Sequence, residues 1–282
     1  MPPLSTGSPR ADAADDFLRA RRREAVRRLS RRLERGGDVD VILPFDEVVA
    51  ELGRTGQVDL GLQVIELDSI IGTVDRDRNF DRAFRPTAGR LRFRWERIAE
   101  MMRRGESLPP ISVYRVGVVH FVRDGHHRVS VSRALGATDI EARVVEVRTR
   151  VGADRALRVS DLPLKGHERL FRERVPLPSD AAGRVVLSDP WRYGELAEGV
   201  EAWGFRAMQD RAELLDREAV AALWYEQELV PTVQIIREAG LADDGWTDAD
   251  AYIEVSCERY RLMRTHEWSE DVLQRLRAER SR

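Results

Sequence analysis

The residues best equipped for chemistry lie side by side in the segment from Asp124 to Arg128. Its sequence, Asp-Gly-His-His-Arg, places a carboxylate, two imidazoles and a guanidinium next to one another. Three of the chain's five histidines fall between positions 120 and 127. A guanidinium can bind phosphate through two hydrogen bonds, and a carboxylate can hold Mg²⁺ or orient a hydroxyl nucleophile. This concentration of functional groups identifies the segment as the candidate site.

The flanking sequence predicts that this segment is a sharp turn from a strand into a helix. An apolar, β-branched run, VGVVHFV, occupies residues 116–122, and a helical pattern, VSVSRAL, occupies residues 129–135. The first turn of a helix has unpaired backbone N–H groups and a partial positive charge, so it attracts anions. The sequence therefore predicts a phosphate-binding turn.

Each residue of the turn has a functional and a structural interpretation. Asp124 is either a catalytic or Mg²⁺-binding carboxylate, or the N-cap of the following helix. Gly125 provides either room for a ligand at the backbone or a positive φ. The adjacent side chains of His126 and His127 should diverge, so that one faces a phosphate while the other packs. Arg128 either binds phosphate through two hydrogen bonds or pairs with a nearby carboxylate.

Residues outside the turn give weaker signals. Thr73 follows a glycine and can donate its hydroxyl to a phosphate. His120 lies in the middle of a predicted strand, where we expect a structural role. A loop rich in arginine either adds positive charge around the pocket or remains solvated, and its arginines are Arg76, Arg78, Arg82 and Arg85.

Composition and charge exclude several classes of protein. The chain has 282 residues and a formal net charge of −2, so it has no bulk attraction to nucleic acid or to a membrane. No stretch approaches the roughly 20 apolar residues of a membrane span, and the N-terminus lacks the apolar segment of a secretory signal. The single cysteine, Cys257, excludes an intrachain disulfide and fits a reducing cytoplasm. The only lysine, Lys165, is followed by Gly166, which excludes a Walker A loop.

The pattern along the chain predicts four regions and an α+β fold. Residues 1–40 contain a basic helix over 15–35, which either contacts DNA phosphates or presents a solvated face. Residues 41–150 form a small mixed-sheet domain in the order strand, helix, two strands, helix, strand. Residues 151–188 are a charged connector containing several prolines, and residues 189–282 are mainly α-helical.

Periodicity and turn residues also place individual elements within these regions. We expect Thr247 to be the N-cap of a helix that runs to about Met263. The other helices are expected over residues 15–35, 45–52, 95–104, 129–135, 195–211, 216–228 and 230–239, and the strands over 64–71, 111–114, 118–122 and 140–147.

Residues 108–147 resemble the signature half of the ParB/sulfiredoxin superfamily. The similarity lies in a Pro-Ile strand (LPPISVYRV), a glycine turn, a second strand (VVHFVR), the D-G-H-H-R turn and the following helix. It extends more weakly back to Val64 and covers about a third of the chain. The resemblance implies a ParB/sulfiredoxin-like mixed-sheet domain. The sequences ALWYEQELVPTVQIIREAGL and GWTDADAYIEVSCERY resemble a helical extension of ParB-like proteins from actinobacteria.

The turn differs from that of each well-known branch of the superfamily. ParB proteins bind CTP with a G-E-R-R-x-R box, of which only Gly125 and Arg128 match. Sulfiredoxins have a catalytic cysteine at the position of His126, and the only thiol of this chain is distant in sequence, so sulfiredoxin chemistry is excluded. Free-serine kinases carry a D-G-H-x-R loop that holds the phosphates of ADP or ATP, and this loop is the most similar to Asp124–Arg128.

The resemblance implies a nucleotide-binding protein, with CTP, ATP or ADP and Mg²⁺ as cofactors. The leading hypothesis is a ParB-like regulatory or partition-type switch that forms a homodimer and associates with DNA through residues 15–35. The alternative is a small-molecule phosphotransferase resembling free-serine kinases, whose catalytic glutamate corresponds to a region containing Glu66, Asp68 and Asp75. The implied catalytic residues are Asp124 and His126, and the implied cofactor-binding residues are Gly125, His126, His127, Arg128, Thr73 and Arg78.

Overall fold

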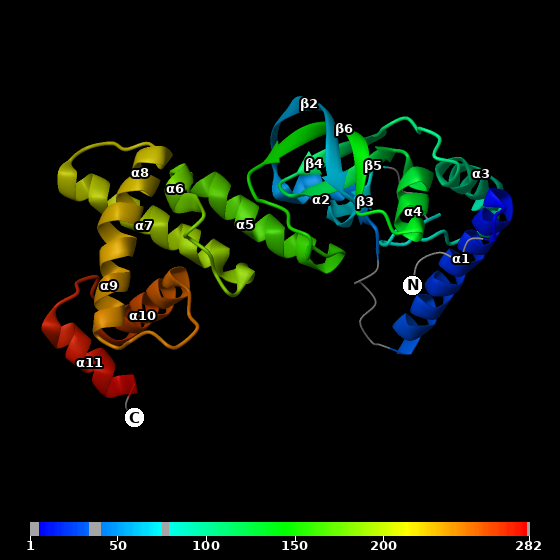
Figure 1. Cartoon of the computed structure of the whole chain (residues 1–282). Helices are drawn as coiled ribbons and strands as arrows, with labels where there is room; N and C mark the ends of the chain where they lie inside the picture. The colour runs from blue at the N-terminus through cyan, green and yellow to red at the C-terminus, as the bar shows by residue number, and fades with distance from the viewer. Residues whose placement is uncertain (1–5, 34–40, 75–78, 281–282) are drawn as a thin grey trace. The chain divides into compact units, whose positions relative to one another are not determined.

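The chain folds into two compact units, Met1–Lys165 and Gly166–Arg282, each with its own hydrophobic core. The computed structural model describes residues 6–33, 41–74 and 79–280. The first unit contains a mixed β-sheet with helices, and the second is helical (Figure 1). The predicted α+β fold with a helical C-terminal region is therefore confirmed.

A six-stranded mixed sheet forms the centre of the N-terminal unit, in the order β1-β3-β5-β4-β6-β2. The pairs β1·β3, β3·β5 and β4·β6 are parallel, whereas β4·β5 and β2·β6 are antiparallel. The strands are β1 Leu43–Pro44, β2 Arg54–Glu66, β3 Ile70–Thr73, β4 Ile111–Val116, β5 Val119–Asp124 and β6 Asp139–Thr149.

The prediction of one strand over residues 64–71 is wrong, because this segment contains the end of one strand and the start of another. Strand β2 ends at Glu66, a 3₁₀ turn covers Leu67–Ser69, and β3 begins at Ile70. Most of β2 was not predicted, since its residues are largely exposed and include two glycines. Its antiparallel pairing with β6 at one end of the sheet, rather than a local apolar pattern, gives it an extended conformation.

Helices α2 and α4 pack against the sheet, and three helices of this unit also pack against one another in a further hydrophobic cluster. Helix α2, Phe45–Leu52, packs with Phe121 of β5 in one core, and Val129 of α4 packs with Val113 in another. A third cluster joins α1, α3 and α4 through Phe17, Trp95 and Val131. The three helices are α1 Pro9–Leu33, α3 Arg92–Arg103 and α4 His126–Leu135.

Helix α1 buries only some of its apolar residues. Phe17 and Ala20 pack in the core, whereas Leu18, Val26 and Leu29 are 42%, 65% and 61% exposed. The reason is that α1 docks on α3 through its first half, where the carboxylate of Asp16 also pairs with Arg103 at 2.6 Å. The apolar positions in the second half of α1 have no such partner among the described residues.

The C-terminal unit is a set of helices that extends into the segment expected as a connector. Residues 151–188 contain the whole of α5 and α6, so this segment is not simply a connector. The expected helix over 216–228 is divided, because residues 225–229 form a π-helix just before Pro231, which has no N–H for a regular helical hydrogen bond. The helices are α5 Leu162–Arg174, α6 Ser179–Ala182, α7 Tyr193–Arg211, α8 Arg217–Trp224, α9 Val230–Glu238, α10 Asp248–Met263 and α11 Glu270–Arg280.

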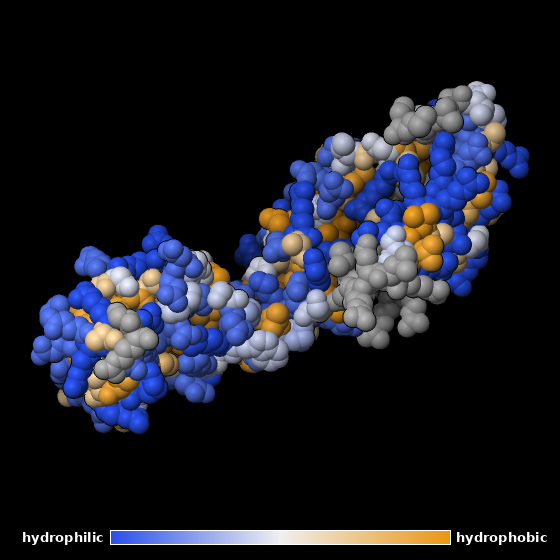
Figure 2. Space-filling view, turned by 90° about the horizontal axis from the view of Figure 1, so that it is seen from below, coloured by the Kyte–Doolittle hydropathy of each residue, from blue (hydrophilic) through white to orange (hydrophobic). Residues whose placement is uncertain are grey.

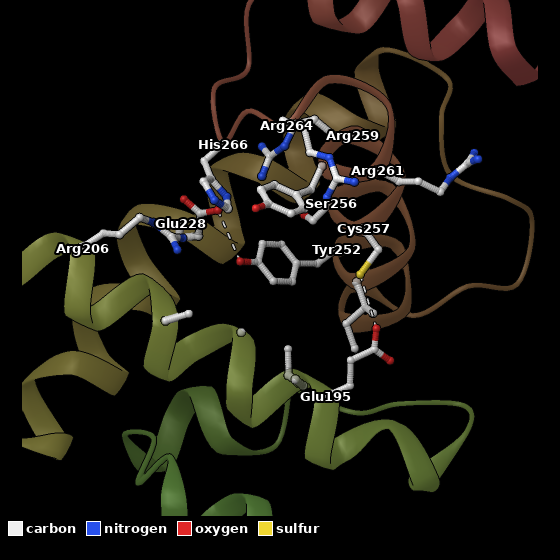
Figure 3. Close-up of a pocket in the computed structure, with 15 residues that line it drawn as sticks. Glu195, Arg206, Glu228, Tyr252, Ser256, Cys257, Arg259, Arg261, Arg264 and His266 are labelled. Carbon is white, nitrogen blue, oxygen red and sulfur yellow. Dashed lines mark hydrogen bonds between the residues drawn. The ribbon is translucent and has the colours of Figure 1, made fainter.

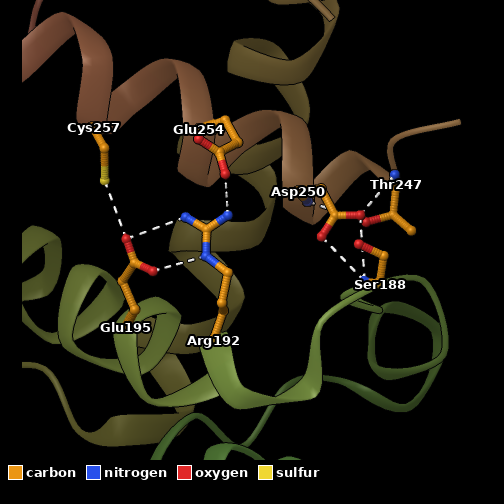
Figure 4. A network of polar contacts seen from close by, with 7 residues as sticks. All are labelled: Ser188, Arg192, Glu195, Thr247, Asp250, Glu254 and Cys257. Atoms are coloured by element: carbon orange, nitrogen blue, oxygen red, sulfur yellow. Dashed lines mark hydrogen bonds and ion pairs between the residues drawn. The ribbon is translucent and has the colours of Figure 1, made fainter. Parts of the chain in front are cut away.

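The N-terminus of α10 is held by a capping box. As predicted, Thr247 is the N-cap, and its hydroxyl accepts a hydrogen bond from the amide of Asp250 at 3.1 Å. The Asp250 carboxylate accepts from the amides of Thr247 and Ser188, which fastens the segment before α7 to α10 (Figure 4). One turn further along α10, Glu254 pairs with Arg192, which also pairs with Glu195 of α7.

The face seen in Figure 2 is mainly hydrophilic, with small separate apolar areas. Within residues 6–33, 41–74 and 79–280, no helix has both the length and the apolar character needed to cross a bilayer.

Candidate functional site

The strand-to-helix turn of the N-terminal unit depends on glycine at position 125. Gly125 has φ +104°, and a Cβ added to it would lie 2.5 Å from Cγ2 of Ile111. Its carbonyl accepts the hydrogen bond from the amide of Val129 at 3.0 Å, so Gly125 is the N-cap of α4. The alternative that Asp124 caps the helix is therefore wrong. Within the described part of the chain, no side chain caps this helix.

A cavity of about 320 Å³ lies beside the first turn of α4. The turn contributes all five of its residues to the wall, and α3 contributes an arginine. The cavity thus adjoins the N-terminal end of α4, where the helix dipole favours an anion. The wall consists of Asn79, Leu91, Arg94, Ile98, Asp124, Gly125, His126, His127 and Arg128.

The two histidines of the turn are held differently against the same aromatic ring. The ring of His126 stacks on Phe80 with centroids 6.3 Å apart, while the ring of His127 meets Phe80 edge-on at 5.3 Å. His126 also stacks on Phe84. Both imidazoles reach the cavity from fixed orientations, which suits them to recognising a ligand there.

Thr73 positions His126 and does not line the cavity. Its side chain is buried, and its hydroxyl oxygen lies 2.6 Å from Nε2 of His126 and 3.3 Å from the carbonyl oxygen of Val122. The hydroxyl has one proton, so donating it to Val122 leaves the oxygen to accept from His126. Thr73, which was predicted to donate to a phosphate, is therefore linked to the cavity only through His126.

Arg128 is engaged in bonds that hold the turn together. Its guanidinium donates to the carbonyl of Pro109, to that of Pro110 at 2.8 Å and to the carboxylate of Asp124 at 2.5 Å. These bonds join the start of β4 to the first turn of α4. The ion pair that the sequence left open as an alternative is present, and it neutralises the charges of Arg128 and Asp124.

Arg94 of α3 is the cation of the cavity that the sequence reasoning missed. It is exposed and has no ion pair among the residues that the structure describes. Its neighbour Trp95 is fully buried and donates its indole N–H to Ser130 of α4 at 2.8 Å, which fixes α3 against α4. No local pattern marks Arg94, because only the packing of α3 on α4 brings it to the turn.

Most of the other predicted site residues lie elsewhere. Arg78, Arg76 and Asp75 lie outside the described residues. Arg82 and Arg85 do not line the cavity: Arg82 donates to the carbonyl of Leu157 at 2.7 Å, and Arg85 pairs with Asp81 at 3.5 Å. Glu66 and Asp68 are also absent from the cavity wall. No group of three or more metal-binding side chains occurs in the described part of the chain.

His120 has the structural role expected from its sequence context. It is buried in β5, and its Nδ1 lies 2.8 Å from the hydroxyl oxygen of Ser69, which donates to the carbonyl of Glu66. Burial, followed by the charges of Arg115 and Arg155, lowers the pKa of His120 to about 4. The imidazole is therefore neutral near pH 7.

Comparison with known proteins adds no assignment to this geometry. No family model matches the chain, and no match is found among curated proteins or among solved structures. The resemblance to the ParB/sulfiredoxin superfamily thus stays a prediction. What the geometry itself supports is an anion site formed by the N-terminal end of α4, one arginine and two oriented imidazoles.

Proposed function

We propose that the N-terminal unit binds a nucleotide, CTP, ATP or ADP, through its phosphates in the cavity beside α4. The observation that carries the proposal is the presence of Arg94 in the same wall as the first turn of α4. The charges of Arg128 and Asp124 cancel each other in their ion pair. The charge of Arg94 and the dipole of α4 remain, and both favour an anion. The cavity volume of about 320 Å³ is at the lower end of the range of about 300–1,000 Å³ that is usual for small-molecule sites.

Mg²⁺ would enter with the nucleotide. Mg²⁺ is commonly held by one or two carboxylates together with substrate phosphates and water. Asp124 is the carboxylate of the cavity wall, and its side chain is 68% exposed, so it can exchange its bond with Arg128 for a metal ion. In this proposal Arg128 would then be able to turn toward a phosphate, as the resemblance implies.

Calorimetry with two matched variants tests the proposal. Wild-type protein is titrated with CTP, ATP and ADP in the presence of Mg²⁺, and the measurement is repeated with Arg94→Gln and Arg97→Gln. Arg97 is exposed on the same helix and is not part of the cavity wall. A hydrogen bond to a charged group contributes about 1.5–3 kcal/mol, so Arg94→Gln should weaken binding about ten- to a hundredfold. Arg97→Gln should bind as the wild type does.

Two outcomes would contradict the proposal. The first is the absence of binding of all three nucleotides at millimolar concentration. The second is an equal affinity of the Arg94 and Arg97 variants, which would place the ligand elsewhere. Assaying the same mixtures with free amino acids for ADP or AMP formation separates a binding switch from a phosphotransferase. If a transfer activity is found and it survives in Asp124→Ala, Asp124 is not a catalytic residue.

Association with DNA through residues 15–35 is a separate part of the proposal. Arg22 and Arg23 are exposed on α1, which supports a role in neutralising phosphates. A gel shift comparing the full chain with its Arg22→Gln/Arg23→Gln variant tests this role. Equal binding by the two proteins would exclude these arginines as the contact. The oligomeric state, for which a homodimer is expected, can be measured on the same samples by light scattering.

A further inference from the structure

The C-terminal unit contains its own cavity, of about 360 Å³, enclosed mainly by α7 and α10 (Figure 3). Much of its wall is apolar, with Leu196 of α7 and Tyr252 and Ile253 of α10. The π-helix before α9 contributes Glu228. Such π-helical insertions occur frequently at functional sites, and a largely apolar cavity with a few polar groups is typical of small-molecule sites.

A buried cation without an ion pair among the described residues forms part of this wall. Arg259 is only 2% exposed, and among the described residues its Nε and Nη1 have no hydrogen-bond partner and its guanidinium has no ion pair. The guanidinium lies over the ring of Trp268 at 3.9 Å. Burial lowers its pKa, and the negative charge of Glu228, which forms no ion pair with it, acts in the opposite direction. A charge removed from water in this way costs free energy unless an opposite charge or hydrogen-bond acceptor compensates it.

A hydroxyl on the same face of α10 is also unsatisfied. The Oγ atom of Ser256 is buried without a hydrogen-bond partner in the described part of the chain. Ser256 lies three residues before Arg259 and four after Tyr252, a spacing that brings all three to one side of a helix. All three belong to the cavity wall, as Figure 3 shows. A guanidinium and a hydroxyl that both lack partners are the groups that a carboxylate would satisfy.

The remaining charges of the wall also favour an anion. Arg206, Arg261 and Arg264 add three cations, and none of them has an ion pair among the described residues. The wall contains two acids, and one of them, Glu195, is neutralised by Arg192 at 2.9 Å. The other, Glu228, accepts a hydrogen bond from the Tyr252 hydroxyl at 3.3 Å. The cavity therefore has an excess of positive charge.

The last turns of α10 disfavour a doubly charged ligand more than a singly charged one. Residues 259–261 of the wall belong to the C-terminal part of this helix, where the dipole is negative. The cavity also has largely apolar walls, in which a phosphate dianion would be poorly solvated. A carboxylate on an apolar body meets both conditions.

We propose that the cavity between α7 and α10 binds a small organic carboxylate, with its charged group at Arg259 and Ser256 and its apolar body along α7. This site is independent of the nucleotide site proposed for the N-terminal unit. It assigns a ligand class to the C-terminal unit and gives a reason for the unsatisfied guanidinium nitrogens of Arg259.

Calorimetry on the full chain with octanoate and 1-octanol as probes tests this proposal. The two probes share an apolar chain and differ in charge, so octanoate should bind at least tenfold more tightly than octanol. Arg259→Met should remove this preference while keeping an apolar stem over Trp268. Arg217→Gln is the control, because Arg217 is exposed on α8 and is not part of the cavity wall.

The single cysteine supplies a second readout within the same cavity. Cys257 lines the wall, and its thiol donates to Glu195 at 3.3 Å. Burial, together with the Glu195 carboxylate, raises the pKa of this thiol to about 11, so its reaction with a disulfide reagent should be slow and measurable. Bound octanoate should slow the reaction further, at least threefold, in wild-type protein and not in Arg259→Met.

Thermal unfolding distinguishes a ligand site from a structural cation. Because the guanidinium of Arg259 is buried without an ion pair among the described residues, Arg259→Met should unfold at the wild-type temperature or higher while losing octanoate. Equal affinity for octanoate and octanol in the wild type would overturn the proposal, even if the variant does not fold. Binding of inorganic phosphate without binding of octanoate would overturn it as well.

Discussion

Acidification is expected to destabilise the N-terminal unit through His120. The Ser69 hydroxyl donates to the carbonyl of Glu66, so its oxygen accepts from Nδ1–H of His120, and the proton of the neutral imidazole is on Nδ1. The other ring nitrogen, Nε2, is buried without a hydrogen-bond partner in the described part of the chain. A second proton would therefore place an uncompensated charge in the core.

The charged groups around His120 oppose this second proton. Arg115 and Arg155 both lower the pKa of the imidazole, in addition to the larger effect of burial. Each arginine has a carboxylate partner: Arg115 pairs with Glu146 at 2.6 Å, and Arg155 pairs with Glu66. These acids are engaged with the arginines and do not raise the pKa of His120 to its ordinary value.

The size of the effect follows from the two pKa values of His120. The ordinary value of 6.5 applies to the unfolded chain, and the folded value is about 4. Between these values the unfolded state binds more protons than the folded state, so stability falls as the pH is lowered. Proton linkage then predicts a loss of about 2 kcal/mol between about pH 7.5 and pH 5, with most of the loss below pH 6.5.

Urea unfolding of wild type and His120→Asn at these two pH values measures the effect. Asparagine keeps an N–H donor for Ser69 and does not titrate. The indole signal of Trp95 in NMR spectra reports on the N-terminal unit alone, because Trp95 is the only tryptophan in its sequence. The wild type should lose about 2 kcal/mol more than the variant on acidification. His167→Asn, which changes a histidine of the other unit, should behave as the wild type does.

An equal loss in wild type and His120→Asn would refute this reasoning. A direct titration of the His120 ring with a midpoint near its ordinary pKa would refute it independently. Comparing two pH values within each protein removes any effect of the substitution that does not depend on pH.

Three further outcomes are expected. Gly125→Ala should lower the stability of the N-terminal unit by about 2–4 kcal/mol in urea unfolding, because its φ is positive and a methyl group would collide with Ile111. Thr73→Val should weaken nucleotide binding about two- to tenfold in calorimetry, because His126 loses its 2.6 Å hydrogen bond while the fold is retained. Asp250→Asn should destabilise the C-terminal unit by about 1 kcal/mol near pH 7, measured by chemical unfolding. Burial alone would raise the pKa of Asp250, but the hydrogen bonds that it accepts outweigh burial and lower the pKa. The difference between wild type and Asp250→Asn should therefore be present above about pH 4 and disappear as the pH falls through the lowered pKa.

Local sequence patterns determined the turn at Gly125 and the capping box at Thr247. In both places the decisive contacts join residues within a few positions of one another, such as the carbonyl of Gly125 with the amide of Val129. The apolar runs on either side of the turn likewise identified β5 and α4, since their burial follows the period of a strand and of a helix.

Packing between distant segments decided which residues form the cavities. Arg94 reaches the turn only because Trp95 is buried against α4, and Arg128 is held by carbonyl groups at the start of β4. Thr73 was predicted to bind a phosphate, but the pairing of β3 with β5 places it next to His126 instead. None of these relations has a fixed spacing in the sequence.

The same distinction explains the C-terminal unit and the limits of the prediction. The sequence by itself determined the helical character of this unit and the fold class of the whole chain, because periodicity and capping act over one or two turns. Only the tertiary structure decided that Arg259 is buried without an ion pair among the described residues and that α1 turns Val26 to solvent. Burial and charge compensation depend on which surfaces meet, and residues far apart in the chain supply those surfaces.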